Sequence, residues 1–233
     1  MSNEPTWENQ DWIHRAKEVL AWMETIGQNQ PLMFLVRHSH RETLQNHDEM
    51  VSGGLTELGK KMAAELGKRI PREGKMHIYT SFVPRCFETA EAIAEGYTQR
   101  GGEVIDIDAV PSLVGPQILD RDVWKNLNPN GDNITDFVNT WADGHFGERM
   151  EPFADYRNRL MDDTIKRLLS ADDGIIHVHV THDLALMSAK RMFFKRALSA
   201  SDREPYLGGI GLTFSDSQKV LFAQGEEMLL GPD

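Results

Sequence analysis

The segment PLMFLVRHSHRE, residues 31–42, decides the fold class of this chain of 233 residues. Its apolar run at 32–36 is typical of a strand that is buried on both faces. The run leads directly into two arginines and two histidines at 37–41, and charge this dense is costly to bury unless an ion of opposite sign is held there. The segment therefore predicts a buried strand that ends at an anion site, for which a phosphate group is suited.

Hydrophobic periodicity on either side of this segment predicts alternating strands and helices. The expected strands lie at 32–36, 77–80, 104–107, 174–181, 211–214 and 219–222, and the expected helices at 10–27, 56–70, 85–97, 153–169 and from about 184. Such alternation predicts an α/β fold, a three-layer α/β/α sandwich with a mostly parallel central sheet. We expect one domain over 1–233, with 1–30 as an N-terminal helical extension and about 109–150, rich in Pro, Gly, Asn and Asp, as an inserted cap.

Composition and charge exclude several classes of partner. The formal net charge is −11 and no long cluster of Lys or Arg occurs, which argues against binding to nucleic acid or to an anionic membrane. Cys86 is the only cysteine, so an internal disulfide is impossible. The first residues lack the pattern of a signal peptide, and no apolar run approaches the ~20 residues of a membrane span. We expect a cytoplasmic protein, and its oligomeric state is left open.

Polar residues follow three of the expected strands at their carboxyl ends, where reactive groups gather in parallel sheets. Arg37 and Arg41 flank His38, and planar guanidinium groups suit phosphate oxygens while a neutral imidazole can act as a nucleophile. Arg85 lies in the first turn of a helix, whose macrodipole also favours an anion. The His-Asp pair at 182–183 adds a second imidazole and a carboxyl group. Together these residues offer an anion clamp, a nucleophile and a proton donor.

Four segments carry a resemblance to the histidine phosphatase superfamily, which has the phosphoglycerate-mutase-like fold. RHSHR at 37–41 resembles the Arg-His-Gly signature of that family, and LTELGKKMAAELGKRI at 55–70 resembles the helix that follows it. TSFVPRCFETAEAIA at 80–94 resembles its arginine-bearing segment, and VTHD at 180–183 resembles its second histidine motif. The likeness extends over roughly 32–195 in the family's order.

The resemblance implies a role for each matching residue. His38 would attack phosphorus and become transiently phosphorylated, and Asp183 would protonate the leaving oxygen and then activate water. Neither a metal nor another cofactor is implied, because arginines take the place of the cation. The residues that would bind the phosphoryl oxygens are Arg37, Arg41, Arg85 and His182.

The second arginine, at position 41, and the His-Asp pair resemble the acid-phosphatase branch of the superfamily. In the mutase branch the proton donor is a Glu from the segment after the third arginine, and residues 104–147 contain no Glu. That absence favours Asp183 as the donor and hydrolysis over mutase chemistry. Asp120 or Asp122, in the expected cap, is the alternative donor.

Ser39 stands where the family usually has Gly, and Thr43 stands where the acid-phosphatase pattern has Pro. A Cβ at position 39 could crowd the phosphate or require a different backbone angle, and the serine hydroxyl could instead donate a hydrogen bond to it, so Ser39 is included among the substrate-binding residues. Two further hypotheses therefore stay open: a catalytically weak phospho-ligand-binding or regulatory protein, and a phosphoglycerate-mutase-like phosphotransferase.

Three other chemistries fit the sequence less well. HVHVTHD, at 177–183, has its last two residues in the wrong order for a metal-binding His-x-His-x-Asp-His motif, and His177 and His179 are expected to be interior residues on one sheet face. A thiol phosphatase needs an arginine six residues after Cys86, where Ala92 stands. DIDAV at 106–110 fits the nucleophile motif of haloacid-dehalogenase-like phosphatases, but its late acidic partner lies too close in sequence.

The expected substrate is a small-molecule or protein phosphomonoester. Its identity depends on the cap, whose side chains either line the entrance to the site or pack the cap onto the core. The candidates are Trp124, Trp141, His145, Phe146 and Arg149.

Overall fold

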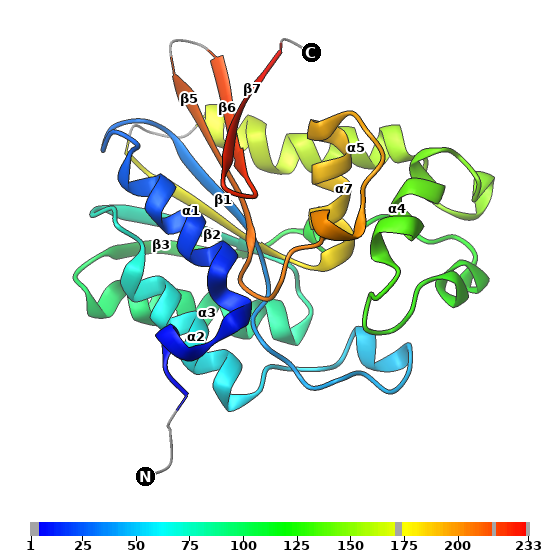
Figure 1. Cartoon of the computed structure of the whole chain (residues 1–233), viewed down its shortest axis with the longest axis horizontal. Helices are drawn as coiled ribbons and strands as arrows, with labels where there is room; N and C mark the ends of the chain where they lie inside the picture. The colour runs from blue at the N-terminus through cyan, green and yellow to red at the C-terminus, as the bar shows by residue number, and fades with distance from the viewer. Residues whose placement is uncertain (1–4, 171–173, 216–217, 232–233) are drawn as a thin grey trace.

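The computed structural model describes residues 5–170, 174–215 and 218–231, and Figure 1 shows a central sheet with helices on both faces. No helix in these ranges is both long and apolar enough to cross a membrane. The strands are β1 (Leu32–Arg37), β2 (Lys75–Thr80), β3 (Glu103–Ala109), β4 (Ile176–Thr181), β5 (Gly209–Ser215), β6 (Gln218–Ala223) and β7 (Glu226–Leu230). The α-helices are α1 (His14–Glu24), α2 (Glu57–Arg69), α3 (Pro84–Gln99), α4 (Ile134–Ala142), α5 (Phe153–Met161), α6 (Arg167–Leu169) and α7 (Asp183–Phe194).

The strands form one mixed sheet in the order β3-β2-β4-β1-β5-β6-β7. The four strands from β3 to β1 are parallel, and β5, β6 and β7 continue the sheet in antiparallel pairs. The predicted α/β sandwich is thus confirmed, with parallel strands at the centre and an antiparallel end.

Both faces of β1 are buried, as its unbroken apolar sequence predicts. Leu32, Phe34 and Val36 face a core shared with α1, α2 and α3, whereas Met33 and Leu35 face a core shared with α5, α7 and the segment that contains α4. Successive side chains of a strand point to opposite faces, so a strand between two helical layers must be apolar at every position.

Two helices differ from their predicted bounds. The helix expected over 10–27 starts with a 3-10 turn at 11–13, which another at 7–9 precedes, and α1 itself covers only His14–Glu24. The helix expected over 153–169 is continuous from α5 to α6, but residues Asp162–Lys166 form a π-helical turn. Such bulges realign a helix face without ending the helix, and hydrophobic spacing does not reveal them.

The sequence-based prediction ended at a hairpin and missed β7. Gln224 and Gly225 connect β6 to β7 with φ of 56° and 82°, and two consecutive positive φ angles are typical of a two-residue type I′ hairpin turn. The strand EEMLL was missed because its two leading glutamates are uncommon in strands. As a result, β7 and not β6 is the edge of the sheet.

His177 and His179 share one face of β4, as predicted, and both are buried. The ring of His179 stacks on Tyr79 at 4.8 Å between centroids, and neither of its nitrogens has a hydrogen-bond partner within the described residues. Burial lowers the pKa of His177 to about 4 and the pKa of His179 well below its ordinary value. Both rings are therefore held neutral in the folded chain.

This burial makes the fold sensitive to acid. Below about pH 6.5 the unfolded chain binds protons that the buried rings do not, so the free energy of unfolding should fall by ~1.4 kcal/mol per pH unit for each such histidine, down to about pH 4. Replacing His179→Phe should lessen that fall, as measured by urea unfolding at about pH 7 and about pH 5. The exposed control His145→Asn should keep the native pH dependence, and an unaltered dependence in His179→Phe would contradict the prediction.

Candidate active site

The polar segments that follow β1, β2 and β4 meet at one edge of the sheet. The three strands are adjacent and parallel, so their carboxyl ends lie side by side. They enclose a cavity of about 90 Å³ to which all six residues predicted as catalytic contribute. The lining residues are Arg37, His38, Arg41, Met50, Val51, Val83, Arg85, Val114, Trp124, Leu127, Pro129, Asn130, Gly131, His182, Asp183 and Leu184.

His38 is held as a neutral imidazole with its Nε2 unprotonated. Its Nδ1 lies 2.8 Å from the carbonyl oxygen of Ser39, which can only accept, so Nδ1 carries the proton. Nε2 accepts a hydrogen bond of 3.1 Å from Nε of Arg85. Burial, and then the charges of Arg85 and Arg37, hold the pKa of His38 well below its ordinary value. The neutral imidazole can therefore act as a nucleophile through Nε2 once the N–H of Arg85 leaves that lone pair.

Arg85 joins the two site histidines. It lies in the first turn of α3, which Pro84 begins, and its NH2 donates to Nδ1 of His182 at 3.0 Å while its Nε donates to His38. Burial lowers the pKa of Arg85 to about 10, so the guanidinium stays charged at neutral pH. Its NH1 is buried and has no partner in the described part of the chain. This N–H group is the donor that an incoming oxyanion would meet.

His182 orients Arg85 and is itself fixed by Ser81. Because its Nδ1 accepts from a guanidinium, its proton is on Nε2, which donates to Oγ of Ser81 at 2.9 Å. Burial and the charge of Arg85 keep the pKa of His182 well below its ordinary value. Cys86 lies against the same ring, with Sγ 3.3 Å from Nε2, and burial raises the pKa of its thiol to about 12. Cys86 is thus a packed thiol in contact with His182.

Asp183 bridges two arginines at the start of α7. Its Oδ1 forms an ion pair with Nε of Arg37, and its Oδ2 lies 3.1 Å from NH2 of Arg203. Arg203 is the more exposed partner, at 28% of its side chain against 6% for Arg37, and its NH2 also donates to the carbonyl of Asn130 at 2.6 Å.

Arg37 is held from three further sides by the segment after α7. Its NH1 donates to the carbonyl of Glu204 at 2.9 Å, its guanidinium lies 4.5 Å from the ring centroid of Tyr206, and its backbone N–H donates to Gly208 at 2.9 Å. Tyr206 also packs against the His38 ring at 5.7 Å. Residues 203–208 therefore hold Arg37 in place, and Tyr206 of this segment also contacts His38.

Arg41 connects the site to the predicted cap. Its NH1 donates to Oδ1 of Asn130 at 3.0 Å and to the carbonyl of Glu42 at 2.8 Å. Asn130 in turn exchanges hydrogen bonds with the backbone N–H and C=O of Leu44 at 2.9 and 3.0 Å. This amide thus fixes the loop after β1 against residues 128–131.

Ser39 points away from the cavity. Its hydroxyl donates to the carbonyl of Gly59 in α2 at 2.7 Å, its backbone N–H donates to Oγ1 of Thr89 at 3.0 Å, and it is not one of the cavity-lining residues. Its φ lies outside the left-handed region, so the serine is not strained there. The serine hydroxyl thus has a partner in α2 rather than one in the cavity.

We expect Ser39→Gly to leave the turnover of any phosphoester within about threefold of the native value, because no side-chain atom of Ser39 lines the cavity. The loss of the hydroxyl bond to Gly59 should cost ~1 kcal/mol of unfolding free energy. Ser39→Ala, which keeps the Cβ, separates the two effects. A tenfold or larger rise in kcat for the glycine variant alone would show that the Cβ obstructs the substrate.

The alternative proton donors lie elsewhere. Asp120 accepts from the backbone of Asp122 at the start of a 3-10 helix, and the exposed Asp122 pairs with Lys125 at 2.5 Å. Neither lines the cavity, and Asp183 is the one carboxyl group among its described lining residues.

The aspartates of DIDAV lie on β3, an edge strand. Asp108 pairs with His77 at 2.8 Å, and Asp106 is exposed. Among the residues that the structure describes, no group of three or more His, Cys, Asp or Glu side chains could hold a metal ion.

Of the five cap side chains, one reaches the site. Trp124 lines the cavity, whereas Trp141 and Phe146 are buried in the core beneath α4 and α5. His145 and Arg149 are exposed and do not line it.

Sequence reasoning missed several residues that support the site. They come from two irregular segments for which hydrophobic periodicity gives no signal. The only sequence signal is the Arg-Glu-Pro-Tyr run at 203–206, in which two charged residues lie close to an aromatic residue. These residues are Asn130, Arg203, Glu204 and Tyr206.

Comparison with known proteins identifies the family. The model of the histidine phosphatase superfamily (branch 1) matches residues 33–207, which is well over half of the chain. No curated protein matches the sequence. The likeness of Arg41 and the 182–183 pair to acid phosphatases is not addressed by this match and stays a prediction.

Solved structures share the fold at low sequence identity. Bacillus stearothermophilus YhfR is 22% identical with a TM-score of 0.56, over 84% of this chain and 96% of its own. Phosphoglycerate mutase from Bacillus anthracis is 15% identical with a TM-score of 0.52, over 88% and 93% of the two chains. A phosphoserine phosphatase mutant from Entamoeba histolytica, solved with phosphoserine, is 15% identical with a TM-score of 0.53, over 84% and 98%. These likenesses show the fold, and the family model shows that the chain belongs to the histidine phosphatase superfamily.

Proposed function

We propose that the protein hydrolyses phosphomonoesters without a metal, through a phosphohistidine on His38. The observation that carries the proposal is the state of this side chain: a buried, neutral imidazole whose unprotonated Nε2 lies 3.1 Å from the Arg85 guanidinium. A neutral nucleophile beside a fixed cation suits attack on a dianion, because the cation stabilises the oxygens as their charge redistributes.

The first step forms a bond from Nε2 of His38 to phosphorus and breaks the bond from phosphorus to the ester oxygen. The proton stays on Nδ1, which donates to the carbonyl of Ser39 throughout, and this hydrogen bond stabilises the ring as it becomes positive. NH1 of Arg85 supplies a donor that is not already used, and Arg37 and Arg41 place two further guanidinium groups in the wall. Before attack, the Nε–H of Arg85 must leave the Nε2 lone pair of His38, so that the guanidinium turns from the imidazole to the phosphoryl oxygens.

Asp183 is the proposed proton carrier. It protonates the departing alcohol oxygen, and the carboxylate then takes a proton from the water that attacks phospho-His38, which returns the site to its starting state. For the first turnover Asp183 takes its proton from solvent or from the phosphate monoester monoanion, and a proton on Oδ2 weakens the 3.1 Å contact with the more exposed Arg203. Asp183→Asn should therefore slow turnover by ~10²- to 10⁴-fold.

The alcohol part of the substrate meets apolar side chains. Trp124 and Leu127 from the cap line the cavity together with Val83, Val114 and other apolar residues. We expect Trp124→Ala to raise KM for an aryl phosphate by about tenfold, because the variant loses ~1.4 kcal/mol of apolar contact. Inhibition by inorganic phosphate, which has no alcohol part, should not change. An equal effect on both would contradict a role in binding the alcohol.

The test is a rapid-quench experiment with a ³²P-labelled aryl phosphate in EDTA. We expect label on the native protein within one turnover, labile in acid and stable in base as a phosphoramidate is, with water as the final acceptor. Activity that requires Mg²⁺ would overturn the proposal, and label that passes to an added alcohol in preference to water would indicate a phosphotransferase. A protein that binds phosphate but is never labelled would be a binding protein.

A further inference from the structure

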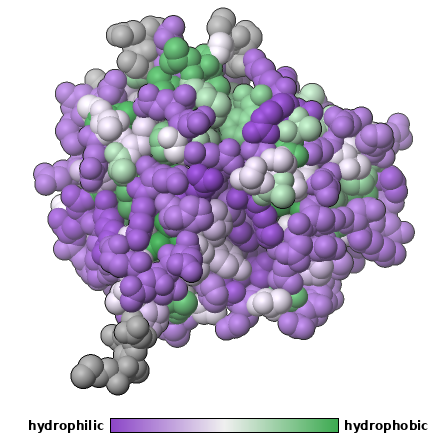
Figure 2. All heavy atoms as spheres, viewed as in Figure 1, coloured by the Kyte–Doolittle hydropathy of each residue, from purple (hydrophilic) through white to green (hydrophobic). Residues whose placement is uncertain are grey.

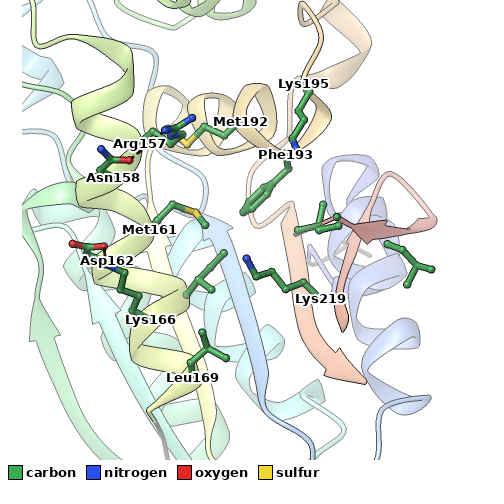
Figure 3. Close-up of a pocket in the computed structure, with 14 residues that line it drawn as sticks. Arg157, Asn158, Met161, Asp162, Lys166, Leu169, Met192, Phe193, Lys195 and Lys219 are labelled. Atoms are coloured by element: carbon green, nitrogen blue, oxygen red, sulfur yellow. Dashed lines mark hydrogen bonds and ion pairs between the residues drawn. The ribbon is translucent and has the colours of Figure 1, made fainter. Parts of the chain in front are cut away.

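A second hollow lies on the side of the sheet that carries α5 and α7, and it is larger than the cavity beside His38, which is called the phosphate cavity below. Its volume is about 940 Å³, and it shares no residue with the site described above. In Figure 3 the helix of α5 forms one wall, the end of α7 lies above, and Lys219 of β6 reaches in from the opposite side. The lining residues are Arg157, Asn158, Met161, Asp162, Ile165, Lys166, Leu169, Met192, Phe193, Lys195, Lys219, Leu229, Leu230 and Gly231.

This hollow is an elongated groove along one helix. Four of its residues, Arg157, Met161, Ile165 and Leu169, follow one another at intervals of four on α5, the π-helical turn and α6. A ridge of this spacing over 157–169 is ~18 Å long and is the surface that another helix packs against. Its length matches about three turns of a partner helix rather than a compact small molecule.

The groove is apolar inside. Met161 and Phe193 project into the space between the helix and the strands (Figure 3), and Leu169 and Leu229 are 57% and 69% exposed. Figure 2 shows apolar surface gathered over the β6–β7 hairpin and toward α5, on a face that is otherwise mostly hydrophilic. Exposed apolar surface of this kind marks interaction sites, and methionine side chains adapt to different partners.

The rim of the groove is cationic although the chain as a whole carries a net charge of −11. Four lysine or arginine side chains line it against one acidic residue, Asp162, which already pairs with Lys166 at 2.5 Å. Arg157 donates only to the amide of Asn158, at 3.4 Å, and Lys195 has no ion pair with a residue that the structure describes. The groove therefore favours an acidic occupant.

We propose that this groove binds an acidic amphipathic helix of a partner protein, with its apolar face on the Met and Leu side chains and its carboxylates toward the cationic rim. Addition of a strand to the edge of β7 fits less well, because Lys219 belongs to the inner strand β6 and the groove thus lies over the face of the hairpin. The groove is remote from the phosphate cavity: Asp183 begins α7 and Lys195 follows its end, ~18 Å away along the helix.

The probe is a fluorescein-labelled synthetic helix of about 14 residues, with Leu at helical spacing and Glu on both flanks, measured by fluorescence anisotropy. The comparison peptide keeps each Leu and replaces every Glu by Lys. We expect the acidic peptide to bind at least tenfold more tightly than the basic one. The double variant Arg157→Glu with Lys195→Glu should reverse that preference, and Leu229→Asp should weaken binding of the acidic peptide at least tenfold.

Lys60→Glu, a charge reversal on α2, is the matched control and should bind as the native chain does, and all variants should hydrolyse aryl phosphates like the native protein. Equal binding of the two peptides, or native affinity in the double variant, would overturn the proposal. The proposal would also be overturned if sedimentation showed that the native chain is a dimer and that Leu229→Asp is a monomer, because a second copy of the chain would then occupy the groove. Binding of dodecanoate in place of the acidic peptide would assign the groove to an aliphatic anion instead.

Discussion

His38→Ala is expected to abolish phosphoester hydrolysis, with kcat/KM reduced by at least ~10³-fold and no phosphate label retained on the protein. The variant removes the nitrogen that attacks phosphorus, and it also leaves Nε of Arg85 without its acceptor. Steady-state hydrolysis of an aryl phosphate measures the loss of turnover, and the acid-labile label in a rapid quench measures the first step, the formation of phospho-His38.

Two controls keep this result interpretable. His145→Ala removes an exposed histidine outside the cavity and should leave activity unchanged. His38→Asn keeps a polar group that can accept a hydrogen bond from Arg85. If this variant is as stable as the native chain and as inactive as His38→Ala, the loss of activity comes from the missing nucleophile and not from unfolding. Retention of activity in both His38 variants would rule out the phosphohistidine route.

Glu204→Leu is expected to lower the free energy of unfolding by ~3–5 kcal/mol, because it leaves the ammonium of Lys190 buried without a counter-charge. The two side chains are 0% and 1% exposed and form an ion pair, and Lys190 also donates to the carbonyl of Asp202 at 2.7 Å. Burial lowers the pKa of Lys190 and raises the pKa of Glu204, so desolvation opposes the pair even as attraction supports it. Urea unfolding at neutral pH is the measurement.

The double variant, Lys190→Met with Glu204→Leu, should recover most of this loss, since apolar pairs of similar volume often replace a buried ion pair without cost. The activity of the double variant should also be measured, because the main-chain carbonyl of Glu204 accepts a hydrogen bond from Arg37. Asp122→Asn breaks an exposed pair and should leave the melting temperature unchanged. A double variant as unstable as Glu204→Leu would show that the pair is not the source of the effect.

The residues that follow the strand ends were the part of this site that could be predicted from the sequence. His38 and His182 directly follow their strands and Arg85 lies five residues after β2, and parallel strands bring their carboxyl ends together whatever the loops do. The direction of a short side chain could not be predicted in this way. Ser39 turns toward Gly59 because α2 packs closely against the loop, which is a tertiary contact with no local signature.

The site residues that were not predicted lie in segments without hydrophobic periodicity. Arg203 and Tyr206 belong to a loop whose course is set by the buried Lys190–Glu204 pair, and neither partner reveals the other in the sequence. Likewise Asn130 reaches Arg41 across 89 positions of chain. Charge burial and loop closure depend on the assembled fold, so hydrophobic patterns of single elements carry no information about them.

The ion pair between Arg37 and Asp183 means that the cavity already contains an anion of its own. A phosphate that enters exchanges one counter-ion of Arg37 for another, so its affinity reflects the difference between two ion pairs and not the whole strength of one. In the proposed reaction the same difference would apply to inorganic phosphate as the product. The carboxylate of Asp183 would thereby limit product inhibition, because it competes with phosphate for Arg37.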